Sequence, residues 1–260
     1  MVKMTDLQIN SDTIKKILID FIRTEVTKTG LTKGIVGLSG GVDSAVVTFL
    51  AVEALGKDNV FAILMPYKSS SPESITDAKI VIEQLGIRSE TVEITPMVDA
   101  YVGRAGEMNS IRKGNIMARQ RMIVLYDVSA RERGLVLGTS NKTEILLGYG
   151  TLFGDTACAI NPIGELYKTQ IWQLAEALNI PRRIIDKKPT ADLWEGQTDE
   201  GELGFSYKRV DQLLNAMIDK KLKDDELSKQ GFGKDFIEKV RGLISQNEFK
   251  RRPSLIAKLG

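Results

Sequence analysis

The chain has 260 residues, of which 42% are hydrophobic and 27% charged, and its formal net charge at pH 7 is +2. This composition is typical of a soluble globular protein, and the near balance of charges argues against bulk binding of nucleic acid. The single cysteine and the absence of histidine exclude an internal disulfide, Ser-His-Asp and Cys-His nucleophiles, and histidine-ligated zinc. Any chemistry must use carboxylates, lysines, hydroxyls, backbone amides and a hard metal ion, which are the groups of phosphoryl and nucleotidyl transfer.

The sequence also bears on location and size. No apolar run approaches the ~20 residues that a membrane helix needs, and the start, MVKMTDLQINSD, is too polar for a signal peptide. We therefore expect a cytoplasmic protein that does not act in a membrane. The chain is long enough for one domain with a substantial core. Because no internal repeat or linker marks a second domain, we predict a single domain over residues 1–260.

Hydrophobic periodicity predicts an alternation of helices and strands. Apolar residues at helical spacing from Ile14 to Val26 predict an amphipathic first helix. A strand at Ile35–Leu38 and a helix that ends near Leu55 come next. The following predicted elements are a strand at 60–66 (VFAILMP), a helix at 75–85, a strand at 91–94 (TVEI), a loop at 103–114, a helix at Asn115–Arg131, a strand at Leu135–Gly138 and a helix at 171–178.

Strands that alternate with helices are typical of a parallel sheet covered by helices on both faces. We therefore predict an α/β fold with a doubly wound parallel sheet over about residues 30–190. A mostly helical C-terminal extension, with loops, is expected over about residues 191–260. Ligands of such sheets bind at the carboxyl ends of the strands, where the strand order reverses. If the strands that end at Leu38 and Gly138 are neighbours, Asp43 and Glu144 can share one Mg²⁺.

The stretch IVGLSGGVDSAVV places a polar turn between a strand and a helix. Gly40 and Gly41 lack a Cβ and allow a ligand to approach the backbone closely, and free N–H groups at a helix start favour an anion. Ser39 and Ser44 add hydroxyl donors. Asp43 repels phosphates unless a cation lies between them, and Mg²⁺ is the natural cation. The turn therefore predicts a phosphate site, although a plain turn with Asp43 as helix N-cap is the alternative.

The turn matches neither G-x-x-x-x-G-K-[ST] nor G-x-G-x-x-G. Instead, SGGVDS resembles the pyrophosphate loop of the N-type ATP pyrophosphatases, which adenylate a substrate and release pyrophosphate. A second, longer motif, LGTSNKTEILLGYGTLFGDTACAINPIGELYK, is far more specific. Together with GNIMARQRM and KKPTADLWEGQTDEGELGFSY, it resembles the ammonia-dependent NAD synthetase family over nearly the whole chain. The resemblance implies an adenine-nucleotide alpha-hydrolase-like fold and a homodimer.

The resemblance also implies a reaction, the last step of NAD biosynthesis. Transfer of AMP from ATP activates the nicotinate carboxylate of deamido-NAD, and ammonia then displaces AMP to form the amide of NAD. ATP is the co-substrate and Mg²⁺ the metal cofactor. Such a ligase must stabilise departing pyrophosphate, align two substrates and exclude water.

Residue roles follow from matching positions. For the ATP phosphates, the resemblance implies Gly37, Leu38, Ser39, Gly40, Gly41, Val42, Asp43 and Ser44, with Thr139, Lys168 and Thr190 as further ATP-binding residues. Asp43 and Glu144 would bind the metal. Lys168 is also a predicted catalytic residue, because it would stabilise the leaving pyrophosphate. Each has a plainer alternative: a helix cap for Asp43 and Thr139, a solvated helix-start acid for Glu144, an exposed lysine for Lys168 and a turn residue for Thr190.

The deamido-NAD site is expected at Arg119 and Lys250. A guanidinium suits the anionic nicotinate or pyrophosphate, although a single arginine is by itself more typical of a solvated surface. The chain departs from the family pattern at three positions. Relatives carry a His-Lys pair where this chain has Phe249-Lys250, and some use a Lys and an Asp at the positions of Leu152 and Ala159. Phenylalanine can stack but cannot replace the hydrogen bonds of an imidazole.

Two other enzyme classes and one binding class remain as alternatives. Enzymes that thiolate tRNA use paired cysteines, and Cys158 stands alone. A GMP synthetase would need a second domain. A nucleotide-binding sensor needs no group to stabilise leaving pyrophosphate, so Asp43, Glu144 and Lys168 argue against it.

The nitrogen source is expected to be free ammonia. Glutamine-dependent relatives add an amidase domain, for which the chain has no room ahead of Ile35. Most ammonia is protonated at neutral pH, so a base must accept a proton. Asp155, in the loop GYGTLFGD, is the predicted catalytic acceptor, and a loop-capping aspartate is the alternative.

Overall fold

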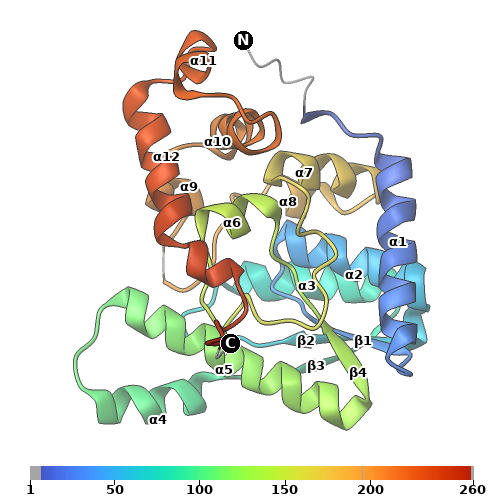
Figure 1. Cartoon of the computed structure of the whole chain (residues 1–260). Coiled ribbons are helices and arrows are strands. Elements are labelled where there is room, and N and C mark those ends of the chain that lie inside the picture. The colour runs from blue at the N-terminus through green and yellow to red at the C-terminus, as the bar shows by residue number, and fades with distance from the viewer. Residues whose placement is uncertain (1–6, 195, 259–260) are drawn as a thin grey trace.

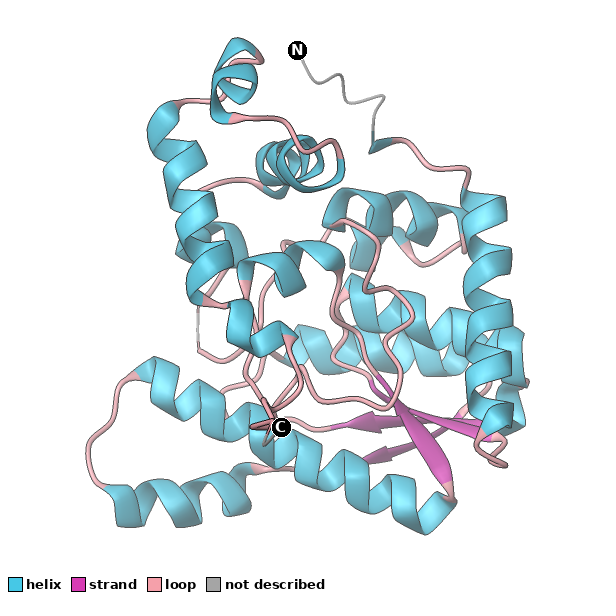
Figure 2. Cartoon of the chain, in the orientation of Figure 1, coloured by secondary structure: helices cyan, strands magenta, loops and turns pink. Residues whose placement is uncertain are grey.

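The computed structural model describes residues 7–194 and 196–258, and a four-stranded parallel sheet lies at its centre (Figures 1 and 2). The strands are β1 (Lys33–Gly37), β2 (Val60–Leu64), β3 (Arg88–Thr91) and β4 (Gly134–Leu137). Their order is β3-β2-β1-β4, so the chain first adds strands on one side of β1 and later returns to the other side. The doubly wound parallel sheet and the adjacency of β1 and β4 are confirmed.

Helices cover both faces of the sheet (Figure 1). On one face lie α1 (Ser11–Lys28), α2 (Val42–Leu55), α3 (Pro72–Leu85), α7 (Lys168–Ala177) and α8 (Arg182–Ile185), and on the other lie α4 (Thr95–Ala105) and α5 (Ser110–Glu132). The strand side chains alternate between the two cores: Ile35 packs with α4 and α5, while Val36 packs with α2 and α7. Both side chains are fully buried, as expected for a central parallel strand.

The C-terminal part of the chain is helical, as predicted. It comprises α9 (Asp199–Leu203), α10 (Tyr207–Leu214), the π-helix η3 (Asn215–Asp219), α11 (Asp224–Lys229), α12 (Lys234–Gln246) and the 3₁₀-helix η4 (Glu248–Arg251). One further 3₁₀-helix, η2 (Lys57–Asn59), lies outside this part and directly precedes β2. A third core lies between these helices, α6 (Lys142–Leu147) and the start of α7. Within the described ranges, no helix is both long enough and apolar enough to cross a bilayer.

Three predicted boundaries are wrong. β3 ends at Thr91, where the sequence predicts its start, because its residues are mostly exposed at the edge of the sheet and give no apolar signal. The apolar Val92 and Ile94 follow the strand and pack against α4 and α5. The helix predicted from Asn115 begins at Ser110, where Asn109 caps it. The predicted loop at 103–114 therefore contains the end of α4, which was not predicted, and the first turn of α5.

Candidate active site at the carboxyl ends of β1 and β4

The turn after β1 requires glycine at its tightest point. Gly40 has φ +78°, and a Cβ at this position would lie 2.1 Å from the carbonyl oxygen of Ser74 on α3. Any other residue would therefore push α3 away and strain the backbone. The backbone N–H of Leu38 donates to the carbonyl of Ile63 on β2 (3.0 Å), which anchors the turn to the sheet.

The first turn of α2 is open to an anion. Gly41 is the N-cap residue and has no side chain to bond the free N–H groups of the helix. The Ser44 hydroxyl donates to the Gly41 carbonyl (3.0 Å) and lies 3.1 Å from the Ser39 hydroxyl, so both serines line the turn. Free N–H groups and the positive end of the helix dipole face the same space, which is the arrangement that binds phosphate.

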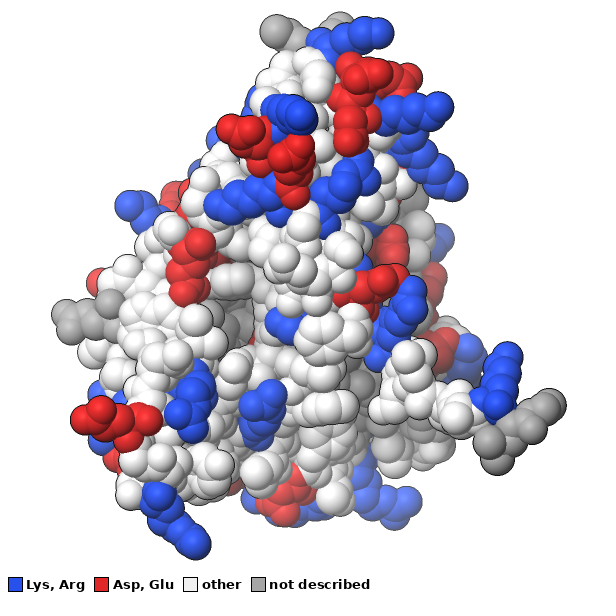
Figure 3. All heavy atoms as spheres, turned by 60° about the vertical axis from the view of Figure 1, so that its left-hand side comes forward, with Lys and Arg blue, Asp and Glu red and all other residues white. Residues whose placement is uncertain are grey.

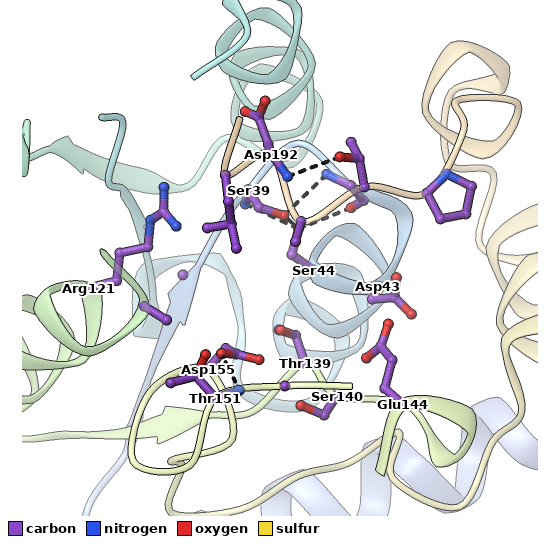
Figure 4. A pocket seen from close by; sticks show the side chains of 18 of the residues that line it. Ser39, Asp43, Ser44, Arg121, Thr139, Ser140, Glu144, Thr151, Asp155 and Asp192 are labelled. Carbon is purple, nitrogen blue, oxygen red and sulfur yellow. Dashed lines mark hydrogen bonds between the residues drawn. The ribbon is translucent and has the colours of Figure 1, made fainter. Parts of the chain in front are cut away.

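The loop after β4 faces this turn. Asn141 is fully buried and caps α6: its side chain accepts from the N–H of Glu144 (3.0 Å), and its own N–H donates to Glu144 Oε2 (3.2 Å). The Asn141 side chain also donates to Asp43 Oδ1 (2.9 Å). Asn141 therefore holds both predicted metal ligands, Asp43 through its side chain and Glu144 through its backbone N–H. Figure 4 shows the two carboxylates pointing toward one another.

Lys168 joins the two carboxylates. Its Nζ donates to Asp43 Oδ2 and lies 3.9 Å from Glu144 Oε1, and the residue is only 2% exposed. The structure thus brings together Asp43, Glu144 and Lys168 from three separate parts of the chain, as the sequence predicts. The exposed lysine that was the plainer alternative for Lys168 is excluded.

Burial and charge tune this cluster. Burial raises the pKa of Glu144 well above its usual range, and the charge of Asp43 raises it further while Lys168 opposes the change. Burial alone would lower the pKa of Lys168, but the charges of Asp43 and Glu144 outweigh it and raise that pKa. The ammonium is therefore fixed in its charged form at neutral pH.

A cavity of about 590 Å³ opens in front of the cluster (Figure 4). This volume is within the range of small-molecule sites. Of the predicted site residues, those that line it are Gly37, Leu38, Ser39, Gly41, Val42, Asp43, Ser44, Thr139, Glu144, Asp155, Lys168, Thr190 and Lys250. Gly40 is buried behind the turn, and Arg119 lies outside the cavity wall.

Asp155 and Lys250 form part of another wall. Asp155 Oδ1 accepts from the N–H of Thr151 (3.0 Å), and Lys250 Nζ donates to the carbonyls of Gly148 (2.7 Å) and Gly150 (3.0 Å). Although Asp155 is open to the cavity, the protein atoms around its carboxyl raise its pKa by desolvation. Burial likewise lowers the pKa of Lys250, which Asp155 opposes.

The helix α5 presents a different arginine from the predicted one. Arg119 is exposed and donates to the carbonyl of Leu152 (3.1 Å from Nη2), whereas Arg121 lines the cavity and donates to the carbonyl of Met65 (3.1 Å). Burial lowers the pKa of Arg121, and the charges of Asp192 and Asp155 oppose that change. The motif GNIMARQRM contains both arginines, and helical spacing does not distinguish them, because each lies three or four residues from cavity-lining positions of α5.

The three departures from the family pattern lie at the edge of this region. Leu152 uses its carbonyl to hold Arg119, Ala159 is exposed, and the Phe249 ring is 59% exposed. In the part of the chain that the structure describes, none of these three side chains lines the cavity. Sequence reasoning missed Asn141, whose place one residue before a helix start, with Glu144 three residues later, is a capping-box signal.

Comparisons with known proteins identify the family of this chain. The model of the NAD synthase family matches residues 14–254. An NH(3)-dependent NAD(+) synthetase of Chlorobaculum parvum is 53% identical over 254 residues, which cover 98% of this chain and 92% of that protein. The solved NMN synthetase of Francisella tularensis has a TM-score of 0.87 at 30% identity, covering 97% of this chain and all of that one. For the NH3-dependent NAD synthetase of Campylobacter jejuni the TM-score is 0.83 at 36% identity, with 96% and 100% covered. The chain therefore belongs to the NAD synthase family.

Proposed function

We propose that this protein is a ligase that converts deamido-NAD to NAD with ATP and free ammonia, releasing AMP and pyrophosphate. The observation that carries the proposal is the cluster of the buried Lys168 with the half-buried Asp43 and Glu144, which faces the open N-terminus of α2. The relatives from Chlorobaculum parvum and Campylobacter jejuni are NH3-dependent NAD synthetases, which supports the same activity.

The reaction has two steps. A nicotinate carboxylate oxygen attacks the α-phosphorus of ATP, the bond to the β-phosphate oxygen breaks, and pyrophosphate leaves. Ammonia then attacks the carbonyl carbon of the acyl adenylate, AMP leaves with the electrons of the C–O bond, and a proton is lost. The first step needs positive charge on the leaving pyrophosphate, and the second needs a proton acceptor in a site that excludes water.

The residues of the cavity fit these needs. The turn from Gly37 to Ser44 and the first N–H groups of α2 bind the ATP phosphates, and Lys168 places a fixed positive charge beside them. Thr139 and Thr190 approach the nucleotide from two other walls of the cavity. Because Asn141 fixes Asp43, the phosphate turn and the loop after β4 keep a constant separation.

The donor set also fits Mg²⁺. Asp43 and Glu144 offer carboxylate oxygens, the ligands that Mg²⁺ prefers, and no group of three acidic, histidine or cysteine side chains in the described chain could hold a metal without the substrate. Asp43 and Glu144 would therefore hold the ion together with phosphate oxygens. When bound, Mg²⁺ neutralises charge on the phosphates.

The test is an assay of all three products with ATP, Mg²⁺, deamido-NAD and an ammonium salt. We expect AMP, pyrophosphate and NAD in equal amounts, and no NAD when glutamine replaces ammonium. Pyrophosphate release without deamido-NAD would indicate another adenylated substrate, and ATP binding without any release would indicate a sensor.

A second candidate substrate is the corresponding mononucleotide. The structure with a TM-score of 0.87 is that of an NMN synthetase, which favours a parallel assay with nicotinate mononucleotide. We expect a higher kcat/KM for deamido-NAD, because the relative from Chlorobaculum parvum shares 53% of its residues and is an NAD(+) synthetase. A higher kcat/KM for the mononucleotide would reverse the assignment.

We also propose that the protein is a homodimer and that α5 contributes to its interface. Large apolar side chains are exposed along this helix and its neighbour α4: Ile123 (59%), Ile111 (66%) and Tyr126 (43%) on α5 and Tyr101 (57%) on α4. Uncharged atoms predominate in the lower half of the face in Figure 3, whereas charged side chains crowd its top. Arg119 lies on the exposed side of α5 and Lys250 lines the cavity, so both can reach deamido-NAD if it extends from the cavity to this interface.

A charge on this face should separate the subunits. Ile123→Glu places a carboxylate in a contact that excludes water, and it should shift the protein to monomer and reduce turnover at low enzyme concentration. Ile17→Glu on α1 is the matched control, since Ile17 is 56% exposed and distant in the fold. Sedimentation velocity gives the mass, and a wild-type monomer with full activity at high dilution would refute the dimer.

Asp155 is proposed as the acceptor of the ammonium proton. Desolvation raises its pKa, which makes the carboxylate a stronger base, and it is lost as a base when the pH falls through that pKa. Asp155→Asn should therefore reduce NAD formation about 10²-fold, with a much smaller loss in pyrophosphate release. Higher pH should rescue part of the loss, because the fraction of free ammonia increases.

The two steps are measured separately by ATP–pyrophosphate exchange and by NAD formation across pH. Asp186→Asn, on the surface beside Arg182, is the control. Equal losses in both steps without pH rescue would reduce Asp155 to a loop cap.

The domain organisation and location remain proposals. Contacts of α10 with α6 and α7 support one domain over residues 1–260. The proposed use of ATP and free ammonia supports action in the cytoplasm.

A further inference from the structure

The first two backbone N–H groups of α7 are held by buried side chains from α6 and α10. Lys168 and Thr169 are the first two residues of α7, and their N–H groups have no partner within the helix. The N–H of Lys168 donates to the Thr143 hydroxyl (3.0 Å), and the N–H of Thr169 donates to Asp211 Oδ2 (2.8 Å). Asp211 is on α10, so a different helix supplies the cap.

Asp211 uses both carboxylate oxygens in this network. Its Oδ1 accepts from the Thr143 hydroxyl (2.6 Å), and its Oδ2 also accepts from the Thr169 hydroxyl (2.8 Å). Asp211 and Thr143 are fully buried, and burial raises the pKa of Asp211 to about 6, while the hydrogen bonds from Thr143 and Thr169 favour its ionised form. A carboxylate at this place also matches the positive end of the α7 dipole.

The same helix contacts the side chain of Lys168. The Tyr207 ring, one turn before Asp211, lies 5.3 Å from Lys168 Nζ, and its hydroxyl donates to Asp199 Oδ2 (2.9 Å). Thr143 directly precedes Glu144 on α6. The network therefore joins the backbone beside Glu144, the backbone of Lys168 and a helix of the C-terminal extension.

We propose that Asp211 is a positioning residue for adenylation: through Thr143 and Thr169 it fixes the start of α7 and so the place of the Lys168 ammonium relative to Asp43 and Glu144. The proposal rests on the function proposed above for the cavity. Asp211 does not line the cavity, so it cannot touch the substrates. Any effect of Asp211 on adenylation must therefore pass through the position of Lys168.

The sharpest test is a pair of variants at one buried position. Thr143→Val keeps the shape but removes the hydroxyl, which leaves Asp211 Oδ1 and the N–H of Lys168 without their partner. Thr143→Ser keeps the hydroxyl. A misplacement of about 1 Å can cost about 10²-fold in rate, so Thr143→Val should reduce kcat for adenylation by about that factor. The KM for deamido-NAD should change little, and Thr143→Ser should retain most of the activity.

Asp211→Asn gives an independent variant. An amide can accept at only one of the two positions, so either the Thr143 hydroxyl or the donors of Thr169 lose their acceptor. We expect the same fall in kcat. Val240→Ala, a buried substitution on α12 that removes no hydrogen bond of the network, is the control for loss of stability. It should lower the melting temperature without the fall in kcat at low temperature.

A readout that does not need turnover separates this proposal from the proposed function. The Nζ signal of Lys168 in ¹⁵N-lysine NMR, assigned from its loss in Lys168→Met, should shift in Thr143→Val and Asp211→Asn but not in Thr143→Ser or Val240→Ala. Wild-type protein that makes no NAD would refute the proposed function while this test still stands. An unchanged Lys168 signal with unchanged kcat in Thr143→Val would overturn the positioning role.

Discussion

Replacing Asp43 with asparagine should slow adenylation about 10³-fold while deamido-NAD binding stays nearly unchanged. The substitution removes one of the two carboxylates that face each other across the site. It takes away a proposed metal ligand and therefore stabilisation of the charge that develops on the phosphates, commonly several kcal/mol. About 4 kcal/mol corresponds to about 10³ in rate. Glu144→Gln should act in the same way. ATP–pyrophosphate exchange measures the step, and calorimetry with deamido-NAD measures binding.

The fold should survive the Asp43 change. Asparagine is isosteric, and its carbonyl oxygen can still accept from Asn141 or Lys168. Asp224→Asn, which breaks an exposed ion pair with Arg241, is the control and should retain full activity. Turnover close to wild type at low Mg²⁺ in either site variant would remove that residue from the metal site.

Lys168→Met should have an effect of similar size on adenylation for a different reason. In the proposed mechanism the buried ammonium stabilises pyrophosphate as it leaves, and the contact with Asp43 fixes its place before the reaction starts. We expect a loss of about 10³-fold, corresponding to about 4 kcal/mol of barrier. Arginine should not restore the rate, since the site is closed around the lysine, which is 2% exposed. Lys15→Met, at a partly exposed ion pair with Glu53, is the matched control.

The same variant should make stability depend on pH. In the wild type, burial and the charge of Asp43 raise the pKa of Glu144, and the positive charge of Lys168 lowers it. Removal of the Lys168 charge therefore raises the pKa of Glu144 further. A carboxyl with a higher pKa in the folded than in the unfolded state binds a proton on folding, and its contribution to stability is lost as pH rises through the folded value. The melting temperature of Lys168→Met should therefore lie further below that of the wild type at pH 8 than at pH 5. An equal loss at both pH values would contradict the charge argument.

The architecture could be predicted because its signals are local. The centre of β1 and all of β2 are apolar, and α7 has apolar residues at helical spacing. The alternation of strands and helices therefore predicts the parallel sheet and the meeting of Asp43 with Glu144. β3 carries no such signal, because an edge strand with exposed side chains has no burial requirement. The apolar residues after it, Val92 and Ile94, belong to the core without being in the strand.

The network behind the site could not be predicted in the same way. Asp211 lies on the apolar face of α10, between Tyr207 and Leu214, but the sequence gives no signal of the distant partners that hold its carboxylate. Its burial depends on contacts with Thr143 and Thr169, which are 68 and 42 residues away. The choice between Arg119 and Arg121 likewise depends on the rotation of α5 about its axis, which helix packing sets.

The parallel pairing of β1 with β4 also governs when the site can form during synthesis of the chain. Lys33 lies against Gly134, so the pairing closes a loop of about 100 residues, and the partners of Asp43 in Asn141 and Lys168 follow 98 and 125 residues later. Contacts between such distant residues form slowly because loop closure costs entropy before any contact offsets it. A nascent chain therefore exposes its phosphate turn long before α7 and α10 leave the ribosome. A ligand stabilises only the state that binds it. ATP can therefore stabilise the folded state of the finished protein but not the growing chain.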